Sequence, residues 1–194
     1  MRTISVFNHV TVDGFFAGPH GEMDWFQAIK HDDEYSKFSH EASKTGDTLI
    51  FGRTTYEIMK RYWPTPGAIR NDPEMAGVMH NIKKIVFSKT LKTVEEGPNW
   101  KNIKLYHEIV PEDILKLKEQ PGKDITILGS GTIVQQFSDL GLIDAYGLVV
   151  VPIVLGAGKS MFKDIKKTDM KLVEARSFNN GVVMLIYTPN KKLS

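Results

Sequence analysis

The sequence of 194 residues contains no cysteine. This absence excludes disulfide bonds, thiolate metal ligands and cysteine nucleophiles, and it leaves histidines and carboxylates as the groups available for metal binding or acid-base chemistry. Long apolar runs are absent too, because none approaches the roughly 20 residues that a membrane-spanning helix needs. Residues 1–5 alternate in character and do not form the apolar block of a signal peptide. We therefore expect a cytoplasmic protein without a membrane partner.

The chain also has little excess charge of either sign. Lys and Arg total 25 and Asp and Glu total 23, which gives a formal net charge of +2. A nucleic-acid-binding protein carries clustered positive charge that this sequence does not show, so we expect no nucleic-acid partner. The six histidines include no H-E-x-x-H motif and no pair four residues apart, and we predict no metal site.

The length suits one domain with a single sizeable core, over residues 1–194. Short apolar runs alternate with amphipathic stretches, which is typical of a sheet covered by helices, so the predicted fold class is α/β. The predicted strands are residues 4–10, 48–51, 85–87, 103–105, 125–128 and 148–151. The predicted helices are residues 34–44, 73–81, 111–119 and 132–140. Two further strand patterns, at 171–173 and 182–187, flank an Asn-Asn-Gly turn and predict an antiparallel hairpin at the end of the chain.

A strand, a glycine and a helix start follow one another at two places. In the first, Gly52 and Arg53 precede Thr54-Thr55-Tyr56-Glu57, which fits a capping box with Thr54 as the N-cap and Glu57 three residues later. A helix N-terminus offers about half a positive charge to an anion. Arg53 lies where a cation is unfavourable for the helix dipole, and an external anion would explain its position.

The second place repeats this pattern. Gly129-Ser130-Gly131 precedes Thr132-Ile133-Val134-Gln135, which fits a capping box with Thr132 as the N-cap and glutamine as the third residue after it. Two such sites together suit a pyrophosphate. Ordinary strand-to-helix turns without any ligand are the alternative interpretation.

Other glycine motifs fail on spacing. A Rossmann fingerprint needs glycine where Val134 stands, and a serine-hydrolase elbow around Ser130 needs glycine at both positions 128 and 132. Residues 156–160 imitate the end of a P-loop, but Ile153 stands where that motif needs glycine. We interpret residues 156–160 as a flexible turn.

A carboxylate directly follows the first predicted strand. Asp13, close to Phe16, can anchor or protonate a nitrogen heterocycle if it is partly desolvated, because burial raises the pKa of a carboxyl. Trp25 is a candidate stacking wall beside it. The alternatives are an aspartate that forms an Asp-Gly turn and a tryptophan that anchors its loop to the core.

Taken in order, these motifs resemble the dihydrofolate-reductase-like superfamily. The most similar branch is the reductase domain of the bifunctional riboflavin-biosynthesis deaminase-reductase, with its stand-alone bacterial relatives. The segments that carry the resemblance are 13–17, 50–57, 85–88, 127–132 and 142–158, so it covers almost the whole chain. The resemblance implies three layers, with a mostly parallel sheet of about eight strands between flanking helices, NADPH as the cofactor and a homodimer.

The resemblance also implies roles for individual residues. The candidates for cofactor binding fall into three groups: Gly52, Arg53 and Thr54 at the phosphates, with Arg53 near the adenosine ribose; Ser88 and Lys89 at the 2′-phosphate; and Gly129, Ser130, Gly131 and Thr132 at the pyrophosphate. The candidates for substrate contact are Asp13, Phe16, Trp25 and Tyr56.

Some positions depart from the family pattern. Dihydrofolate reductases place a proton-relay carboxylate in their first helix, and the nearest match here is Glu34, at an offset from Gly52 that differs from theirs. They also commonly have an aromatic residue where Val134 stands. The cysteines of a deaminase zinc motif are absent, so only the reductase half is expected.

We therefore expect an NADPH-dependent reductase that transfers hydride to a small pterin- or pyrimidine-like substrate, of the 5-amino-6-(5-phosphoribosylamino)uracil reductase type. In this interpretation Asp13 orients or protonates the substrate, Phe16 and Trp25 shield it, and residues 18–24 form a lid. A dihydrofolate reductase and a non-catalytic NADPH-binding module remain the two alternatives.

Overall fold

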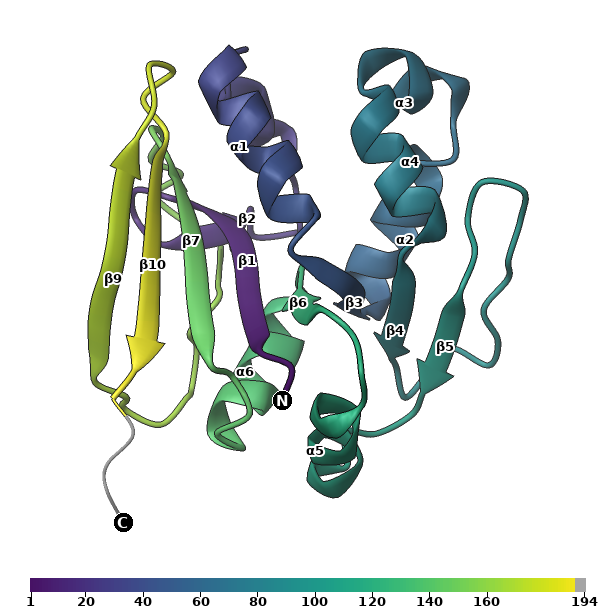
Figure 1. Cartoon of the computed structure of the whole chain (residues 1–194). Coiled ribbons are helices and arrows are strands. Elements are labelled where there is room, and N and C mark those ends of the chain that lie inside the picture. The colour runs from purple at the N-terminus through teal and green to yellow at the C-terminus, as the bar shows by residue number, and fades with distance from the viewer. Residues whose placement is uncertain (191–194) are drawn as a thin grey trace.

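The short apolar runs of the sequence form one eight-stranded sheet in the computed structural model, which describes residues 1–190. The last four residues of the expected domain lie outside the described residues. In spatial order the strands are β5 (Ile103–Tyr106), β4 (Lys83–Phe87), β3 (Gly46–Gly52), β6 (Asp124–Ile127), β1 (Ile4–Thr11), β7 (Ala145–Val151), β10 (Val183–Pro189) and β9 (Met170–Ser177) (Figure 1). Neighbours from β5 to β7 are parallel, whereas β10 is antiparallel to both β7 and β9. The predicted carboxyl-terminal hairpin is confirmed.

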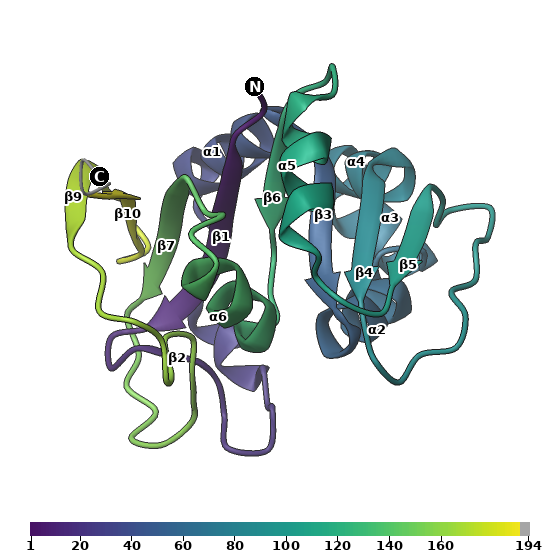
Figure 2. The same ribbon diagram turned by 90° about the horizontal axis from the view of Figure 1, so that it is seen from below.

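Helices cover both faces of this sheet. They are α1 (Asp33–Ser43), α2 (Arg53–Tyr62), α3 (Pro66–Asn71), α4 (Pro73–Asn81), α5 (Pro111–Glu119), α6 (Gly131–Asp139) and the 3₁₀ helix η1 (Asp24–Ala28). Figure 2 shows α5 and α6 in front of the strands and α1, α3 and α4 behind them. The predicted three-layer α/β fold is thus confirmed. Within residues 1–190, none of these helices has the length and apolarity needed to cross a membrane.

Local signals set several helix boundaries. The carboxylate of Asp72 accepts a hydrogen bond from the backbone N–H of Met75 at 2.9 Å, and Pro73 is the first residue of α4. This is the predicted N-cap with proline at the first helical position, where its missing N–H costs nothing. Helix α3 was not predicted, because its six residues are too few to show a helical period.

The alternation of β1 decides which face of the sheet holds the site. Ile4, Val6 and Val10 are buried in the core cluster that includes residues of α5 and α6. Phe7 and His9 point to the opposite face, where Phe7 packs against the cluster around α1. Because side chains alternate along a strand, the odd-numbered residues of β1 all face the α1 layer.

A small second sheet lies beside the carboxyl end of β1. Strand β2 (Phe15–Ala17) pairs antiparallel with β8 (Lys159–Ser160). The interpretation of residues 156–160 as a flexible turn is therefore wrong for its last two residues. The sequence gives no local signal for this pair, because about 140 residues separate two very short strands.

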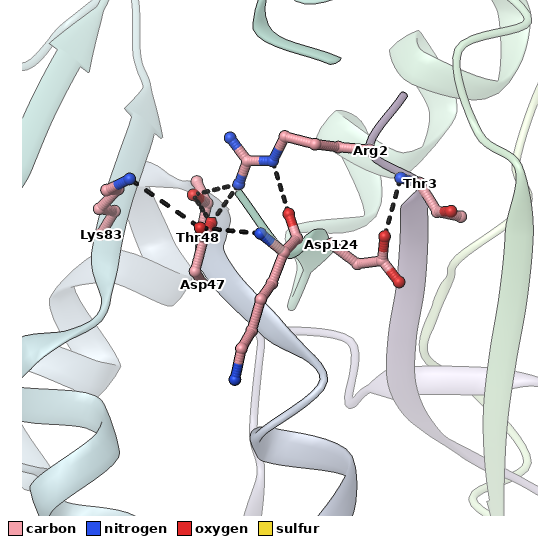
Figure 3. A network of polar contacts seen from close by, with 7 residues as sticks. Arg2, Thr3, Asp47, Thr48, Lys83 and Asp124 are labelled. Atoms are coloured by element: carbon pink, nitrogen blue, oxygen red, sulfur yellow. Dashed lines mark hydrogen bonds and ion pairs between the residues drawn. The ribbon is translucent and has the colours of Figure 1, made fainter. Parts of the chain in front are cut away.

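At the amino ends of the strands, a network of hydrogen bonds and ion pairs links neighbouring strands of the sheet (Figure 3). The guanidinium of Arg2, which is only 5% exposed, pairs with Asp47 and donates to the hydroxyl of Thr48 at 2.7 Å. The backbone N–H of Thr3 donates to the carboxylate of Asp124 at 2.9 Å. The network therefore joins residues at the starts of β1, β3 and β6, at the edge of the sheet opposite the glycine-bearing turns.

Candidate functional site

The two glycine-bearing turns lie next to each other. Gly52 ends β3 and begins the approach to α2, and Gly129 follows β6 just before α6. Because β3 and β6 are adjacent parallel strands, their carboxyl ends meet at one edge of the sheet. The backbone N–H of Gly52 donates a hydrogen bond to the carbonyl oxygen of Gly129 at 3.1 Å. The structure thus brings both predicted phosphate-binding segments into contact.

Both predicted capping boxes are wrong. The N-caps are Gly52 for α2 and Ser130 for α6, and neither helix has a side-chain capping hydrogen bond. Thr54 and Thr132 lie instead in the first helical turns. The carboxylate of Glu57 accepts a hydrogen bond from Arg53 at 2.7 Å and is thereby occupied. Because no side chain caps these helices, their first N–H groups are available to an anion.

Gln135 has a partner far away in the sequence. Its amide donates to the carbonyl oxygens of Ser160, at 3.4 Å, and Met161, at 3.2 Å. This contact holds β8 beside α6, which a local capping pattern cannot predict. Lys159 of β8 consequently lines the same cavity as the first turn of α6 and is a cation that the sequence interpretation missed.

Close approaches require glycine in the second turn. Gly129 has a φ of +110°, a conformation that side chains rarely adopt. A Cβ atom at Gly129 would lie 2.9 Å from the hydroxyl oxygen of Thr55, and one at Gly131 would lie 2.8 Å from the ring of Phe16. The peptide bond between Gly129 and Ser130 is cis. The absence of these side chains lets Phe16 and α2 approach the start of α6.

Arg53 and the segment after β4 also come together. The Arg53 guanidinium donates to the hydroxyl of Thr90 at 2.9 Å, and half of its side chain remains exposed. The hydroxyl of Ser88 is largely buried and accepts from the backbone N–H groups of Thr90, at 3.3 Å, and Leu91, at 3.0 Å. Lys89 is exposed. The predicted 2′-phosphate segment therefore lies beside Arg53, with the Ser88 hydroxyl already engaged in its own turn.

A cavity opens beside these turns on the α1 face of the sheet. Its volume is about 1360 Å³. Its walls combine the two glycine-bearing turns, the odd-numbered residues of β1 and the helices α1, α2 and α4. Residues from these parts include Thr54, Thr55, Gly129, Ser130, Gly131 and His9. Pockets for one small ligand measure roughly 300–1,000 Å³, so this cavity is larger than one such ligand needs.

Asp13 occupies a different environment from the one expected. It is exposed, and its carboxylate accepts hydrogen bonds from the hydroxyl of Thr11 and from the backbone N–H groups of Leu155, at 3.1 Å, and Gly156, at 2.7 Å. The bond from Thr11 outweighs the effect of burial and, with the two backbone bonds, holds the pKa of Asp13 below its ordinary value. The expected rise in pKa is therefore wrong. This geometry favours the alternative interpretation, in which Asp13 organises a turn.

The three aromatic candidates have separate positions. Phe16 lines the cavity beside Gly131. Trp25 is buried behind Phe26, whose ring lies 4.5 Å from it and lines the cavity. Tyr56 is 3% exposed and packs in the core cluster of α2 and α4 with Trp100. Phe16 therefore lines the cavity and its substrate contact stays a prediction, whereas Trp25 and Tyr56 are core residues in this structure.

Among the described residues, Glu34 is not one of those that line the cavity. Its carboxylate pairs with Arg176 of β9 at 2.7 Å, and about half of the side chain is exposed. The adjacent residue in α1 makes the contact that the sequence interpretation missed, because the hydroxyl of Tyr35 lies 2.6 Å from Nε2 of His9. Burial lowers the pKa of His9 to about 4 and raises that of Tyr35 to about 12. Both groups are therefore neutral near pH 7.

Comparisons with known proteins agree with this geometry. The sequence matches the family model of the RibD C-terminal domain over residues 2–184. It is 34% identical over 179 residues to the uncharacterized protein YyaP of Bacillus subtilis strain 168, a match that covers 92% of this chain and 90% of YyaP.

Two solved structures share the fold. A candidate riboflavin biosynthesis protein from Shewanella sp. PV-4 superimposes with a TM-score of 0.77 at 19% identity, covering 97% of this chain and 99% of that one. Dihydrofolate reductase from Enterococcus faecalis, complexed with NADP(H), gives a TM-score of 0.63 at 17% identity and covers 97% of each chain. The chain therefore belongs to the family of the RibD C-terminal domain and has a dihydrofolate-reductase-like fold.

Proposed function

We propose that this protein is an NADPH-dependent reductase that transfers hydride to a small pterin- or pyrimidine-like heterocycle. The observation that carries the proposal is the contact between Gly52 and Gly129, which places two uncapped helix N-termini side by side at the rim of one large cavity. Each N-terminus favours an anion, and the pair suits a pyrophosphate.

The residues around these helix starts suit a dinucleotide phosphate. The backbone N–H groups of 53–54 and 131–132 would hold the pyrophosphate, and Arg53 and Lys89 would add positive charge at the carboxyl ends of β3 and β4. Arg53 retains exposed surface despite its pairing with Glu57, so its guanidinium can reach a ligand. The shared fold of the Enterococcus faecalis reductase, which was complexed with NADP(H), supports the same cofactor class.

The remainder of the cavity suits a flat substrate. Phe16 and Phe26 line it, together with the side chains of β1 that face α1. Aromatic rings of this kind bind planar heterocycles by stacking and exclude water from them. A protein of the same fold from Corynebacterium diphtheriae, described as pyrimidine reductase-like, supports a pyrimidine-like substrate.

When bound, NADPH supplies the hydride. The chain contributes binding and orientation. The two helix N-termini hold the phosphate groups, and Phe16 packs against Gly131 at the boundary between the pyrophosphate turn and the rest of the cavity. Holding two reactants in attack geometry lowers the barrier by up to about 7–11 kcal/mol.

A binding and turnover experiment tests the proposal. We expect NADPH to raise the unfolding temperature more than NADH at equal concentration, because ligand binding to the folded state stabilises it. Lys89→Ala should narrow this difference, whereas Lys92→Ala, an exposed lysine of the same loop, should leave it unchanged. Oxidation of NADPH is then followed with dihydrofolate, pterins and ribitylaminopyrimidines as acceptors.

Each result has a distinct meaning. Turnover of pterins or aminopyrimidines supports the proposal. Turnover of dihydrofolate alone would make the protein a folate reductase, and tight NADPH binding without any oxidation would make it a binding module. Failure of NADPH to bind would contradict the proposal entirely.

A further inference from the structure

His9 lies in the wall of the cavity, is hydrogen-bonded to Tyr35, and has no part in the cofactor site described above. His9 comes from β1 and lines the cavity, and Tyr35 comes from α1 and contacts His9 from the side of the α1 core cluster. The imidazole lies 4.8 Å from the ring of Phe26 and 6.0 Å from that of Phe7, measured between ring centroids. His9 is therefore a polar group set among aromatic side chains.

The length of the hydrogen bond indicates its direction. Nε2 of His9 and the hydroxyl oxygen of Tyr35 are 2.6 Å apart. Hydrogen bonds from N–H to oxygen are typically about 2.7–3.2 Å long, whereas a hydroxyl that donates to oxygen approaches to about 2.5 Å, so the short contact favours the hydroxyl as the donor. We therefore assign the Tyr35 hydroxyl as the donor and Nε2 as the acceptor. The phenol keeps its proton near pH 7, because burial raises the pKa of Tyr35 to about 12.

This direction determines the tautomer of His9. A neutral imidazole carries one N–H, and with Nε2 as the acceptor the proton lies on Nδ1. The imidazole remains neutral at pH 7, because burial lowers its pKa to about 4. Within residues 1–190, Nδ1 has no hydrogen-bond partner. His9 is half-buried and lines the cavity, so water can reach this donor until a ligand displaces it. A ligand that offers an acceptor to Nδ1–H therefore binds more tightly than one that displaces the water and leaves the donor unpaired.

We propose that His9 is a substrate-binding residue whose Nδ1–H donates a hydrogen bond to a carbonyl oxygen of a flat heterocycle, and that Tyr35 is the positioning residue that fixes this tautomer. The inference rests on the proposed function for its substrate class, but it does not depend on the cofactor. It adds a specificity: an oxo group at this position accepts the hydrogen bond, whereas an amino group presents a second donor and leaves Nδ1–H unpaired. Such a mismatch of buried polar groups is strongly selective.

Two probes that differ at one substituent test this specificity. Pterin carries an oxo group where 2,4-diaminopteridine carries an amino group, and both fluoresce, so their dissociation constants can be measured by titration without NADPH. For the wild-type protein we expect pterin to bind at least tenfold more tightly. His9→Leu should abolish the preference, since it removes the donor and keeps an apolar side chain of similar size.

Two further variants separate recognition from folding. His9→Asn retains an N–H donor close to the position of Nδ1 and should keep most of the preference for pterin. Tyr35→Phe should weaken this preference, because it removes the hydroxyl that fixes the tautomer of His9 while it keeps the packing against Phe178. His31→Asn is the matched control, because His31 is exposed and, among residues 1–190, pairs with Asp33 alone. If His9→Leu does not fold, the Asn and Phe variants still carry the test.

Long-range ¹H–¹⁵N spectra of the histidines give a second readout that binding does not influence. We expect the Nδ1–H tautomer of His9 in the wild type and a mixture in Tyr35→Phe. An Nε2–H tautomer, equal affinity for both probes, failure of both to bind, or a preference that survives in His9→Leu would each overturn the inference. If NADPH does not bind but the oxo preference depends on His9, the reductase proposal fails and the heterocycle site stands.

Discussion

The backbone N–H of Gly52 donates a hydrogen bond to the carbonyl oxygen of Gly129 at 3.1 Å, although 77 positions of sequence separate the two residues. This bond extends the pairing of β3 with β6 past the end of β6, as far as the last residue of β3. Neighbouring strands are about 4.8 Å apart, so the starts of α2 and α6 are held one strand spacing from each other. An anion bound there meets both helix N-termini at once.

Gly131→Ala should weaken NADPH binding. The added methyl group would lie 2.8 Å from the ring of Phe16, so that ring must move away from the turn for which we propose pyrophosphate binding. We expect the dissociation constant for NADPH to rise at least tenfold, measured by titration calorimetry. Gly77→Ala is the control, since its methyl group meets no neighbour and should stabilise α4 by about 1 kcal/mol. Equal NADPH affinity in both variants would argue against a pyrophosphate at this turn.

Arg53→Ala should also weaken NADPH binding, by about 1–3 kcal/mol, which is typical of a charge-assisted contact. The ion pair of Arg53 with Glu57 is half-exposed, so its loss should change the free energy of unfolding by less than about 1 kcal/mol. Arg61→Ala, near the other end of α2, is the matched control and should bind NADPH normally. Calorimetry and urea unfolding separate the two effects, and unchanged affinity in Arg53→Ala would refute the phosphate assignment.

Asp13→Asn should lower stability in a pH-dependent manner. Hydrogen bonds from Thr11 and from the backbone at 155–156 hold the folded-state pKa of Asp13 below its unfolded value. The carboxylate therefore stabilises the protein above the unfolded pKa, and this contribution disappears as the pH falls through the folded pKa. Urea unfolding should show a deficit for Asp13→Asn at pH 7 that shrinks at pH 3. Asp164→Asn, an exposed aspartate, provides the comparison. A large loss of turnover with no loss of stability would restore the catalytic interpretation.

Lys84 should make the stability of the wild-type protein depend on pH in the alkaline range. The cause is burial of its ammonium, whereas for Asp13 it is hydrogen bonding to the carboxylate. Its ammonium is buried, donates to the carbonyl oxygens of Ile82 at 2.8 Å and Lys101 at 2.9 Å, and lies 4.4 Å from the ring centroid of Trp100. Burial lowers the pKa of Lys84 to about 8, so above that pH the unfolded chain binds more protons than the folded one. Stability should consequently rise with pH between about 8 and 10 relative to Lys84→Met.

The neighbouring lysine controls for this effect. Lys83 is mostly exposed, and Lys83→Met should follow the pH dependence of the wild type. Thermal unfolding at several pH values measures the difference between the two variants. Parallel curves for Lys84→Met and the wild type would show that the amine does not titrate in this range.

Local signals in the sequence predicted the parts of the fold that depend on local physics. Asp72 caps α4 and Asn179-Asn180-Gly181 joins β9 to β10, because each signal acts within a few residues. The capping boxes failed because Glu57 and Gln135 bind other partners, and the partners of Gln135 lie about 25 residues away. The pairing of β2 with β8 joins residues that lie even farther apart in the sequence, so no local signal predicts it.

The candidate site was predictable to a similar degree. The glycine-bearing turns could be found by their spacing, because a strand, a glycine and a helix leave a local pattern. Tyr56 was assigned to the substrate, yet the helix phase cannot tell which face of α2 meets the core, and the structure buries it against Trp100. His9 and Tyr35 were missed because strand alternation identifies the face on which His9 lies but not the helix that covers it.

The contacts of Arg2 with Asp47 and Thr48 make the stability of the sheet depend on the first residues of the chain. Deleting the first two residues would remove Arg2, the main cationic partner of Asp47. The Asp47 carboxylate, which is only 27% exposed, would then be left without that partner, and the start of β3 would be destabilised. We expect the truncated protein to unfold at lower temperature, with its ligand affinities preserved as long as it remains folded.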